Sequence, residues 1–186
     1  MRRTPIIALF ALATVLCASP ASADLFTLEL DAQGTYLELG NVGVAQSSDT
    51  STIRGFGVGA RGRLQILFLN VLVDYQHLFT GGQGADMLHA GLGVGYRFDA
   101  IPVIDLYIQG SIGLLMLTAA PSAYVDDVAA ELEPQAGGQV RAGGGIEIPF
   151  AGDWFAVGVG ADVGGHYLTG EFGYDYSVNV HFGLRI

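Results

Sequence analysis

The sequence Tyr-Ser-Val-Asn-Val-His-Phe-Gly-Leu-Arg-Ile, at residues 176–186, alternates between apolar and polar or small residues over its whole length. Its apolar members are Tyr176, Val178, Val180, Phe182, Leu184 and Ile186. Strict alternation is typical of a β-strand whose two faces meet different surroundings. We therefore interpret this segment as a strand with one apolar and one polar face.

Seven further segments upstream show the same alternation. With the last one, the predicted strands span residues 26–36, 55–68, 71–79, 87–98, 104–117, 138–148, 154–167 and 176–186. Long connections alternate with short turns such as Leu69-Asn70, and a short helix is predicted over Tyr124–Glu133 in the longest connection. An even number of such strands, with long and short connections in turn, is typical of a membrane barrel. The sequence predicts an all-β fold: an eight-stranded antiparallel up-and-down transmembrane β-barrel.

Aromatic residues gather near both ends of the apolar faces. One set comprises Tyr36, Phe56, Tyr75, Phe79, Tyr167 and Tyr176, and the other comprises Phe26, Phe68, Phe98, Phe150 and Phe155. Two such girdles mark the interfaces of a membrane barrel. A soluble lipocalin-like barrel is the alternative, but it would have to fit the apolar faces inside a barrel too narrow for them.

The first 23 residues have the features of a secretory signal. Arg2 and Arg3 precede an apolar run at residues 6–16, and Ala21-Ser22-Ala23 resembles a cleavage site. We predict that residues 1–23 are removed and that residues 24–186 form the barrel. A single transmembrane anchor is disfavoured because the apolar run is shorter than the ~20 residues that cross a bilayer. Cys17, the one cysteine, would leave with the signal.

The chain is acidic, with a formal net charge of −10 at pH 7 and no lysine. This balance argues against a nucleic-acid partner, whose phosphates require basic surface. No cofactor or metal motif stands out. Acidic residues in predicted loops indicate a solvated surface, or a surface for divalent cations; they are Asp49, Asp86, Asp126, Asp127, Glu131, Glu133, Glu171 and Asp175.

The polar faces of the strands carry five arginines and six acids, which would point into the barrel. They are Glu29, Asp31, Arg61, Arg63, Asp74, Arg97, Asp105, Arg141, Glu147, Asp162 and Arg185. Because unpaired buried charge is costly, the near balance predicts a paired plug rather than an ion path. Inward glycines such as Gly93 and Gly145 would make room for the arginines. Alternatively, they would leave an upper cavity for a small apolar ligand or lipid.

Catalysis is a further hypothesis, because some barrels of this size modify lipid. Ser177 and His181 lie four residues apart on one strand, some ~13 Å by strand rise, so they cannot form a nucleophile–base pair. His77 lies on the apolar face near a rim, where a lipid hydrolase would hold its base. Lipid A deacylases of this shape carry serine two residues after that histidine, and this chain has Phe79.

The segments Gly91–Phe98 and His181–Ile186 resemble strands of the OmpA/OmpX-like eight-stranded outer-membrane proteins of Gram-negative bacteria. The resemblance covers the barrel domain only. It implies the cell outer membrane with both termini periplasmic, contact with outer-membrane lipid and lipopolysaccharide, and recognition of the C-terminal strand by the barrel-assembly machinery. It also implies a monomer. We expect a structural or surface-exposed role without enzymatic activity; a ligand-binding barrel and a lipid A-modifying enzyme are the alternatives.

Overall fold

The computed structural model describes residues 26–43, 50–80, 83–101, 103–118, 123–125, 128–130 and 134–186. The predicted signal peptide, residues 1–23, lies outside these ranges. Within them no helix is long and apolar enough to cross a membrane.

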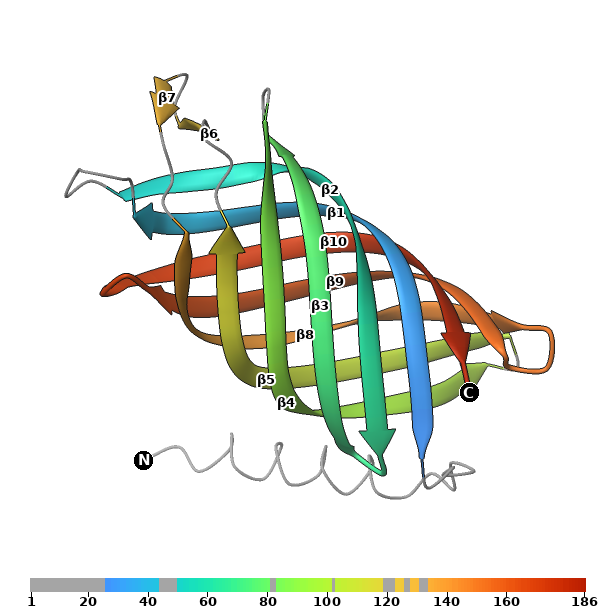
Figure 1. Cartoon of the computed structure of the whole chain (residues 1–186). Coiled ribbons are helices and arrows are strands. Elements are labelled where there is room, and N and C mark those ends of the chain that lie inside the picture. The colour runs from blue at the N-terminus through green and yellow to red at the C-terminus, as the bar shows by residue number, and fades with distance from the viewer. Residues whose placement is uncertain are drawn as a thin grey trace, which may run out of the picture.

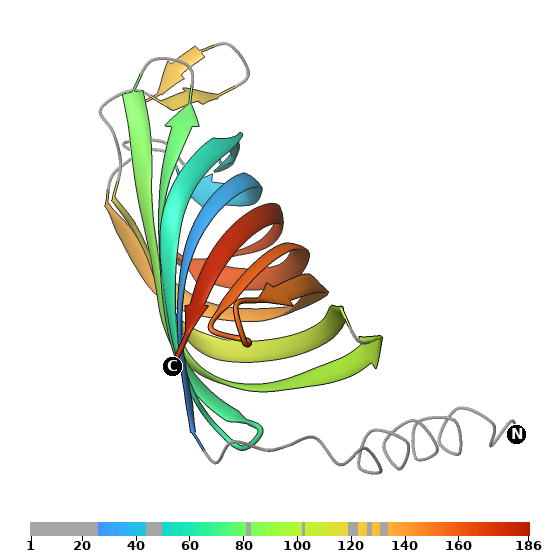
Figure 2. The ribbon, with the colours of Figure 1, turned by 90° about the vertical axis from the view of Figure 1, so that its right-hand side faces the viewer.

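Eight strands form a closed antiparallel barrel, as predicted (Figure 1). They are β1 (Thr27–Gly43), β2 (Thr50–Ile66), β3 (Leu69–Thr80), β4 (Gln83–Ile101), β5 (Ile104–Thr118), β8 (Gln135–Phe150), β9 (Phe155–Leu168) and β10 (Glu171–Arg185). A separate hairpin, β6 (Ala123–Val125) with β7 (Val128–Ala130), lies at the end of the barrel opposite the C-terminus (Figures 1 and 2).

Two local predictions were wrong. The helix expected over Tyr124–Glu133 is replaced, where the chain is described, by the β6–β7 hairpin, and Val125 and Val128 are β-branched residues that favour strands. The turn between β2 and β3 falls at Leu67-Phe68 rather than at Leu69-Asn70, with Leu67 at φ 56°. This register sets Arg61 directly opposite Asp74, so the two can pair inside the barrel.

The barrel closes where β1 pairs with β10, the alternating C-terminal strand. Leu28 and Ile186 exchange backbone hydrogen bonds of 2.7 and 2.8 Å. Following paired residues once round the sheet from Thr27 leads through Asp175 back to Leu39, a stagger of twelve residues along β1. A stagger of this kind tilts the strands against the barrel axis and fixes the width of the interior.

An apolar belt surrounds the barrel. On β1 the outward positions are apolar from Phe26 to Tyr36, the ~9–11 residues that a tilted transmembrane strand needs. The first outward-facing ionisable side chains beyond the belt are Glu38 on β1, Arg54 on β2, His77 on β3 and Asp86 on β4. Hydrocarbon cannot hydrogen-bond the backbone N–H and C=O groups at the edges of a sheet. A sheet that is surrounded by lipid must therefore be closed.

The polarity of the wall reverses beyond the belt, toward the β6–β7 end. There the inward positions become apolar, and ten side chains, each at most 2% exposed, pack together as an apolar cap. The cap consists of Leu37, Leu39, Val42, Ile53, Leu78, Ala85, Met87, Leu115, Leu117 and Leu168. Glu38 faces outward between two cap residues of β1. This end is therefore built like a soluble barrel, with its hydrophobic core inside.

The belt can be tested at Val180, which lies midway along the outward face of β10 and is 59% exposed. We predict that Val180→Arg lowers the free energy of unfolding by ~2–4 kcal/mol, because a charge at the bilayer midplane is poorly solvated. Urea titration in phospholipid vesicles would measure it. The matched control, Thr118→Arg at the loop end, should cost ~0–1 kcal/mol. Equal costs for the two changes would contradict the placement of the belt.

Candidate functional site

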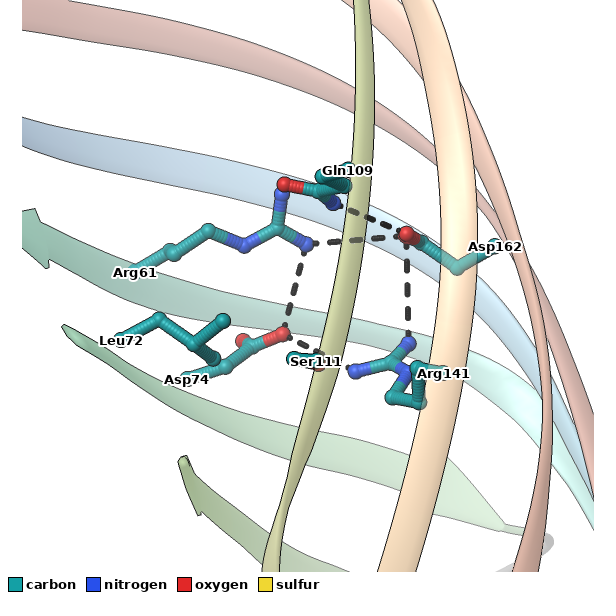
Figure 3. Close-up of a pocket in the computed structure, with 7 residues that line it drawn as sticks. All are labelled: Arg61, Leu72, Asp74, Gln109, Ser111, Arg141 and Asp162. Carbon is teal, nitrogen blue, oxygen red and sulfur yellow. Dashed lines mark hydrogen bonds and ion pairs between the residues drawn. The ribbon is translucent and has the colours of Figure 1, made fainter. Parts of the chain in front are cut away.

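Four charged side chains meet in the middle of the barrel and form a closed ring, here called the middle ring (Figure 3). Arg61 lies 3.3 Å from Asp74 and 3.8 Å from Asp162. Arg141 lies 3.3 Å from Asp74 and 3.9 Å from Asp162. Signs alternate round the ring, so each charge has two partners of opposite sign and the ring is neutral.

Amides supply the hydrogen bonds that the middle ring leaves unmet. Gln33 Nε2 donates to Asp74 Oδ1 at 2.5 Å, and Gln109 Nε2 donates to Asp162 Oδ1 at 2.9 Å. Arg141 Nη2 donates to Ser177 Oγ at 3.1 Å. Buried charges are tolerable only when they are both paired and hydrogen-bonded. These neutral side chains meet part of that requirement, and among the described residues Arg141 Nε is left without a hydrogen-bond partner.

A small cavity of about 10 Å³ is enclosed by the middle ring together with Leu72, Gln109 and Ser111 (Figure 3). This is about the space of one water molecule, and the lining offers several polar partners to it. The cavity is too small for an organic ligand.

A second group of charges, the lower cluster, lies toward the short turns. Glu29 pairs with Arg63 at 3.0 Å and with Arg97 at 2.5 Å. Glu147 pairs with Arg97 at 3.0 Å and also with Arg185. Arg185 reaches Asp105 at 3.2 Å, which completes a cluster of six residues.

The structure thus brings ten of the eleven predicted interior charges into ion pairs. The exception within the described ranges is Asp31, whose carboxylate lies against the backbone of Gly183 and makes no ion pair. Arg63 Nη2 also donates to Gln109 Oε1 at 2.8 Å, so the lower cluster and the middle ring are joined. The charges form one continuous network through the membrane-spanning part of the interior.

The inward glycines make room for this network. A Cβ on Gly143 would collide with the Asp162 carboxylate, and one on Gly145 would lie 2.7 Å from the Tyr107 hydroxyl. The Asp162 carboxylate of the network therefore occupies the space beside Gly143, whereas Gly145 lies against the Tyr107 hydroxyl and the Val159 carbonyl. Nearer the loop end, where the sequence left open an apolar cavity, the interior holds the packed cap.

Sequence reasoning missed the cap and the inward position of Asp175, which lies in an upper polar layer beneath the cap. His89 and His166 are buried there, and Asp175, predicted to be a loop residue, is only 2% exposed. Asp175 faces inward, where Gln139 Nε2 donates to it at 2.9 Å and Arg141 Nε lies 3.5 Å away. Asp175 alternates in step with Ser177 and Asn179 on β10, so it would have been placed inside had the predicted strand begun one residue earlier.

The other acidic positions divide in two. Asp86 lies on the outer wall of β4, and Glu171 begins β10 next to an exposed turn. Asp49, Asp126, Asp127, Glu131 and Glu133 lie outside the described residues. In the part of the chain that the structure describes, no three potential ligands come together as a metal site.

His77 belongs to a small outward-facing cluster at the loop-end rim. Its Nδ1 lies 2.8 Å from Asp86 Oδ1, and the Tyr75 hydroxyl donates to the same oxygen at 2.8 Å. Phe79 packs against the imidazole with ring centroids 5.1 Å apart. A histidine oriented by a carboxylate is half of a hydrolytic site, but among the described residues no serine, threonine or cysteine is hydrogen-bonded to His77.

The inward Ser177 and His181 are bound to different partners, as their spacing predicts. Ser177 accepts from Arg141, whereas His181 Nε2 lies 3.0 Å from Glu147 Oε1 and its Nδ1 lies 3.1 Å from Asn179 Oδ1. They belong to the charge network and do not form a nucleophile–base pair.

An eight-stranded barrel with an apolar belt and a charged interior is a transmembrane β-barrel of the outer-membrane type. The chain is similar to the crystal structure of Neisserial surface protein A, with a TM-score of 0.55 at 13% identity, covering 89% of this chain and 99% of that one. Weaker likenesses are the N-terminal β-barrel domain of Pseudomonas aeruginosa OprF (TM-score 0.46, 15% identity, 85% and 97% covered) and Ail, the attachment invasion locus protein of Yersinia pestis (0.45, 11%, 86% and 98%).

Identities this low show the fold alone. The sequence matches no protein-family model and no curated protein sequence.

The middle ring can be tested with a double-mutant cycle. Asp74→Leu removes the carboxylate between two arginines, and we predict a loss of ~3–5 kcal/mol in the free energy of unfolding, because Arg61 and Arg141 are left with one acid between them. Adding Arg61→Met restores neutrality, so the double variant should be more stable than Asp74→Leu alone. Urea titration of the refolded proteins would measure both. Additive losses would contradict the ring, and Glu171→Leu at the exposed start of β10 serves as the neutral control.

Proposed function

We propose that this chain is an outer-membrane barrel with a structural or surface-exposed role, and that it is neither a channel nor an enzyme. The observation that carries the proposal is the closure of the interior at successive levels. Paired charges fill it across the apolar belt, and the apolar cap fills it at the loop end. An eight-stranded barrel is narrow enough for side chains to close it in this way.

The cap also supports a role at the surface. Strands such as β1 and β2 continue beyond the apolar belt, and their inner faces are buried in the cap. The cap therefore forms a packed platform outside the hydrocarbon. We place this end on the outer side of the membrane and the short turns and C-terminus on the periplasmic side.

The partners follow from this placement. Outer-membrane lipid would surround the belt, and lipopolysaccharide would meet the rim that carries Glu38, Arg54, His77 and Asp86. The alternating strand β10, which closes the barrel against β1, is the segment we assign to recognition by the barrel-assembly machinery. A monomer is sufficient, since the charges are paired within one chain.

The two alternatives have less support. An upper cavity for a ligand would need the space that the cap fills. A lipid-modifying activity would need a nucleophile or an activated water beside His77, whose neighbours are Asp86, Tyr75 and Phe79. We infer that the His77–Asp86 pair fixes the rim of the barrel at the membrane interface.

Conductance tests the proposal. In planar bilayers we expect no current steps from the purified protein. We also expect none from a cap variant with Leu39→Ala, Leu78→Ala and Leu117→Ala, because the charged layers beneath it remain. In a further variant, the cap substitutions are combined with the removal of two ion pairs, Arg141→Ala with Asp162→Ala and Arg97→Ala with Glu147→Ala. Each pair of substitutions leaves the net charge unchanged, and this variant should conduct. Current steps from the unaltered protein, or from the cap variant alone, would contradict the proposal.

A further inference from the structure

A hollow of substantial size lies on the outer wall. It has a volume of about 340 Å³ and lies on β4 and β5, beside the turn between β2 and β3. Its lining comprises the apolar residues Phe68, Val94, Tyr96 and Ile108, together with Gly95, Gln109 and Gly110. Sites for small organic molecules begin at ~300 Å³, so the hollow is large enough for part of a ligand.

The hollow opens within the apolar belt. On β4 the outward positions from Leu88 to Phe98 carry no charge, and the nearest outward-facing charge on this strand is Asp86, toward the loop end. Val94 and Tyr96 lie in the half of this uncharged stretch that is nearer the short turns. The lining presents almost no polar surface. Hydrocarbon is therefore what the hollow meets, and an apolar chain is the occupant that can pack against its lining.

The walls are fixed in place. Gly95 N–H donates to the Phe68 carbonyl at 2.8 Å, which fastens the turn between β2 and β3 onto β4. Tyr96 packs against Phe98 with ring centroids 4.6 Å apart. The hollow exists because Gly110 leaves a gap beside Val94, and its cross-strand neighbour Ala142 is also small. A preformed groove costs its ligand less ordering than one that must open.

We propose that this groove binds one acyl chain of a phospholipid from the leaflet on the side of the short turns. The groove fixes the chain against the barrel wall, while Tyr96, near the rim, offers its hydroxyl to the interfacial part of the same lipid. The phospholipid is thus held more tightly than the lipid that covers the rest of the belt. This proposal rests on the belt facing lipid and is independent of whether the interior conducts.

The glycines of the belt supply a matched pair of variants. A Cβ on Gly110 would meet only the Arg141 carbonyl at 3.7 Å and Val94 Cγ2 at 4.0 Å, so Gly110→Leu should fold with its side chain in the groove. A Cβ on Gly34, in the belt on β1, would meet nothing within 4 Å, so Gly34→Leu adds the same bulk away from the groove. Phe68→Ala removes one wall without filling the groove.

The experiment is native mass spectrometry of each protein refolded in vesicles of phosphatidylethanolamine and phosphatidylglycerol and then stripped with detergent. We expect one phospholipid to stay on the unaltered protein and on Gly34→Leu. Gly110→Leu and Phe68→Ala should retain it roughly tenfold less, because the acyl chain loses its packing contacts along the groove. Equal retention by all four proteins would overturn the proposal. So would a dimer that only Gly110→Leu abolishes, because the groove would then hold a second copy of the chain.

Discussion

A sheet surrounded by hydrocarbon has no water to hydrogen-bond its edges, and the rest of this structure depends on that constraint. Pairing β1 with β10 removes both edges and fixes a narrow interior. Once the sheet is closed, every second residue points into that interior. The charged residues that point inward must then pair with one another, because the narrow interior has little room for water to solvate them. The middle ring and the lower cluster are the outcome of this requirement.

The interior changes character where the membrane ends. Outside the belt the wall meets water, so Glu38 and Arg54 face outward and leucines such as Leu39 turn inward. The same strands therefore have apolar residues outside and polar residues inside within the membrane, and the reverse pattern beyond it. This reversal explains how a single hairpin can both cross a bilayer and stand beyond it. It also closes the loop end with the hydrophobic effect, which operates there and not within the lipid.

Alternation was sufficient to predict the eight strands, the closure and most of the interior charges, because a period of two is a direct record of two unlike environments. The cap was not predicted, since Leu37 and Leu39 on a polar face look like exceptions until the wall is known to extend beyond the lipid. Asp175 was assigned to a loop for the same reason. Predicting the middle ring requires the register between β2 and β3. That register changes when the turn between the two strands moves by even one residue. The groove at Gly110 depends on a missing side chain and a turn that docks from another hairpin, and neither has a sequence signal.

The account stands on an interior sealed beneath the loop end, and cysteine accessibility tests this most directly. Cys17 lies in the predicted signal peptide, so a single introduced thiol would report alone in the mature chain. Ser177→Cys lies below the cap, and Thr118→Cys lies on the outer wall at the same end. With a charged, membrane-impermeant thiol reagent, the account predicts rapid labelling at position 118 and labelling at position 177 only after unfolding. Similar rates at the two positions in the folded barrel would contradict it.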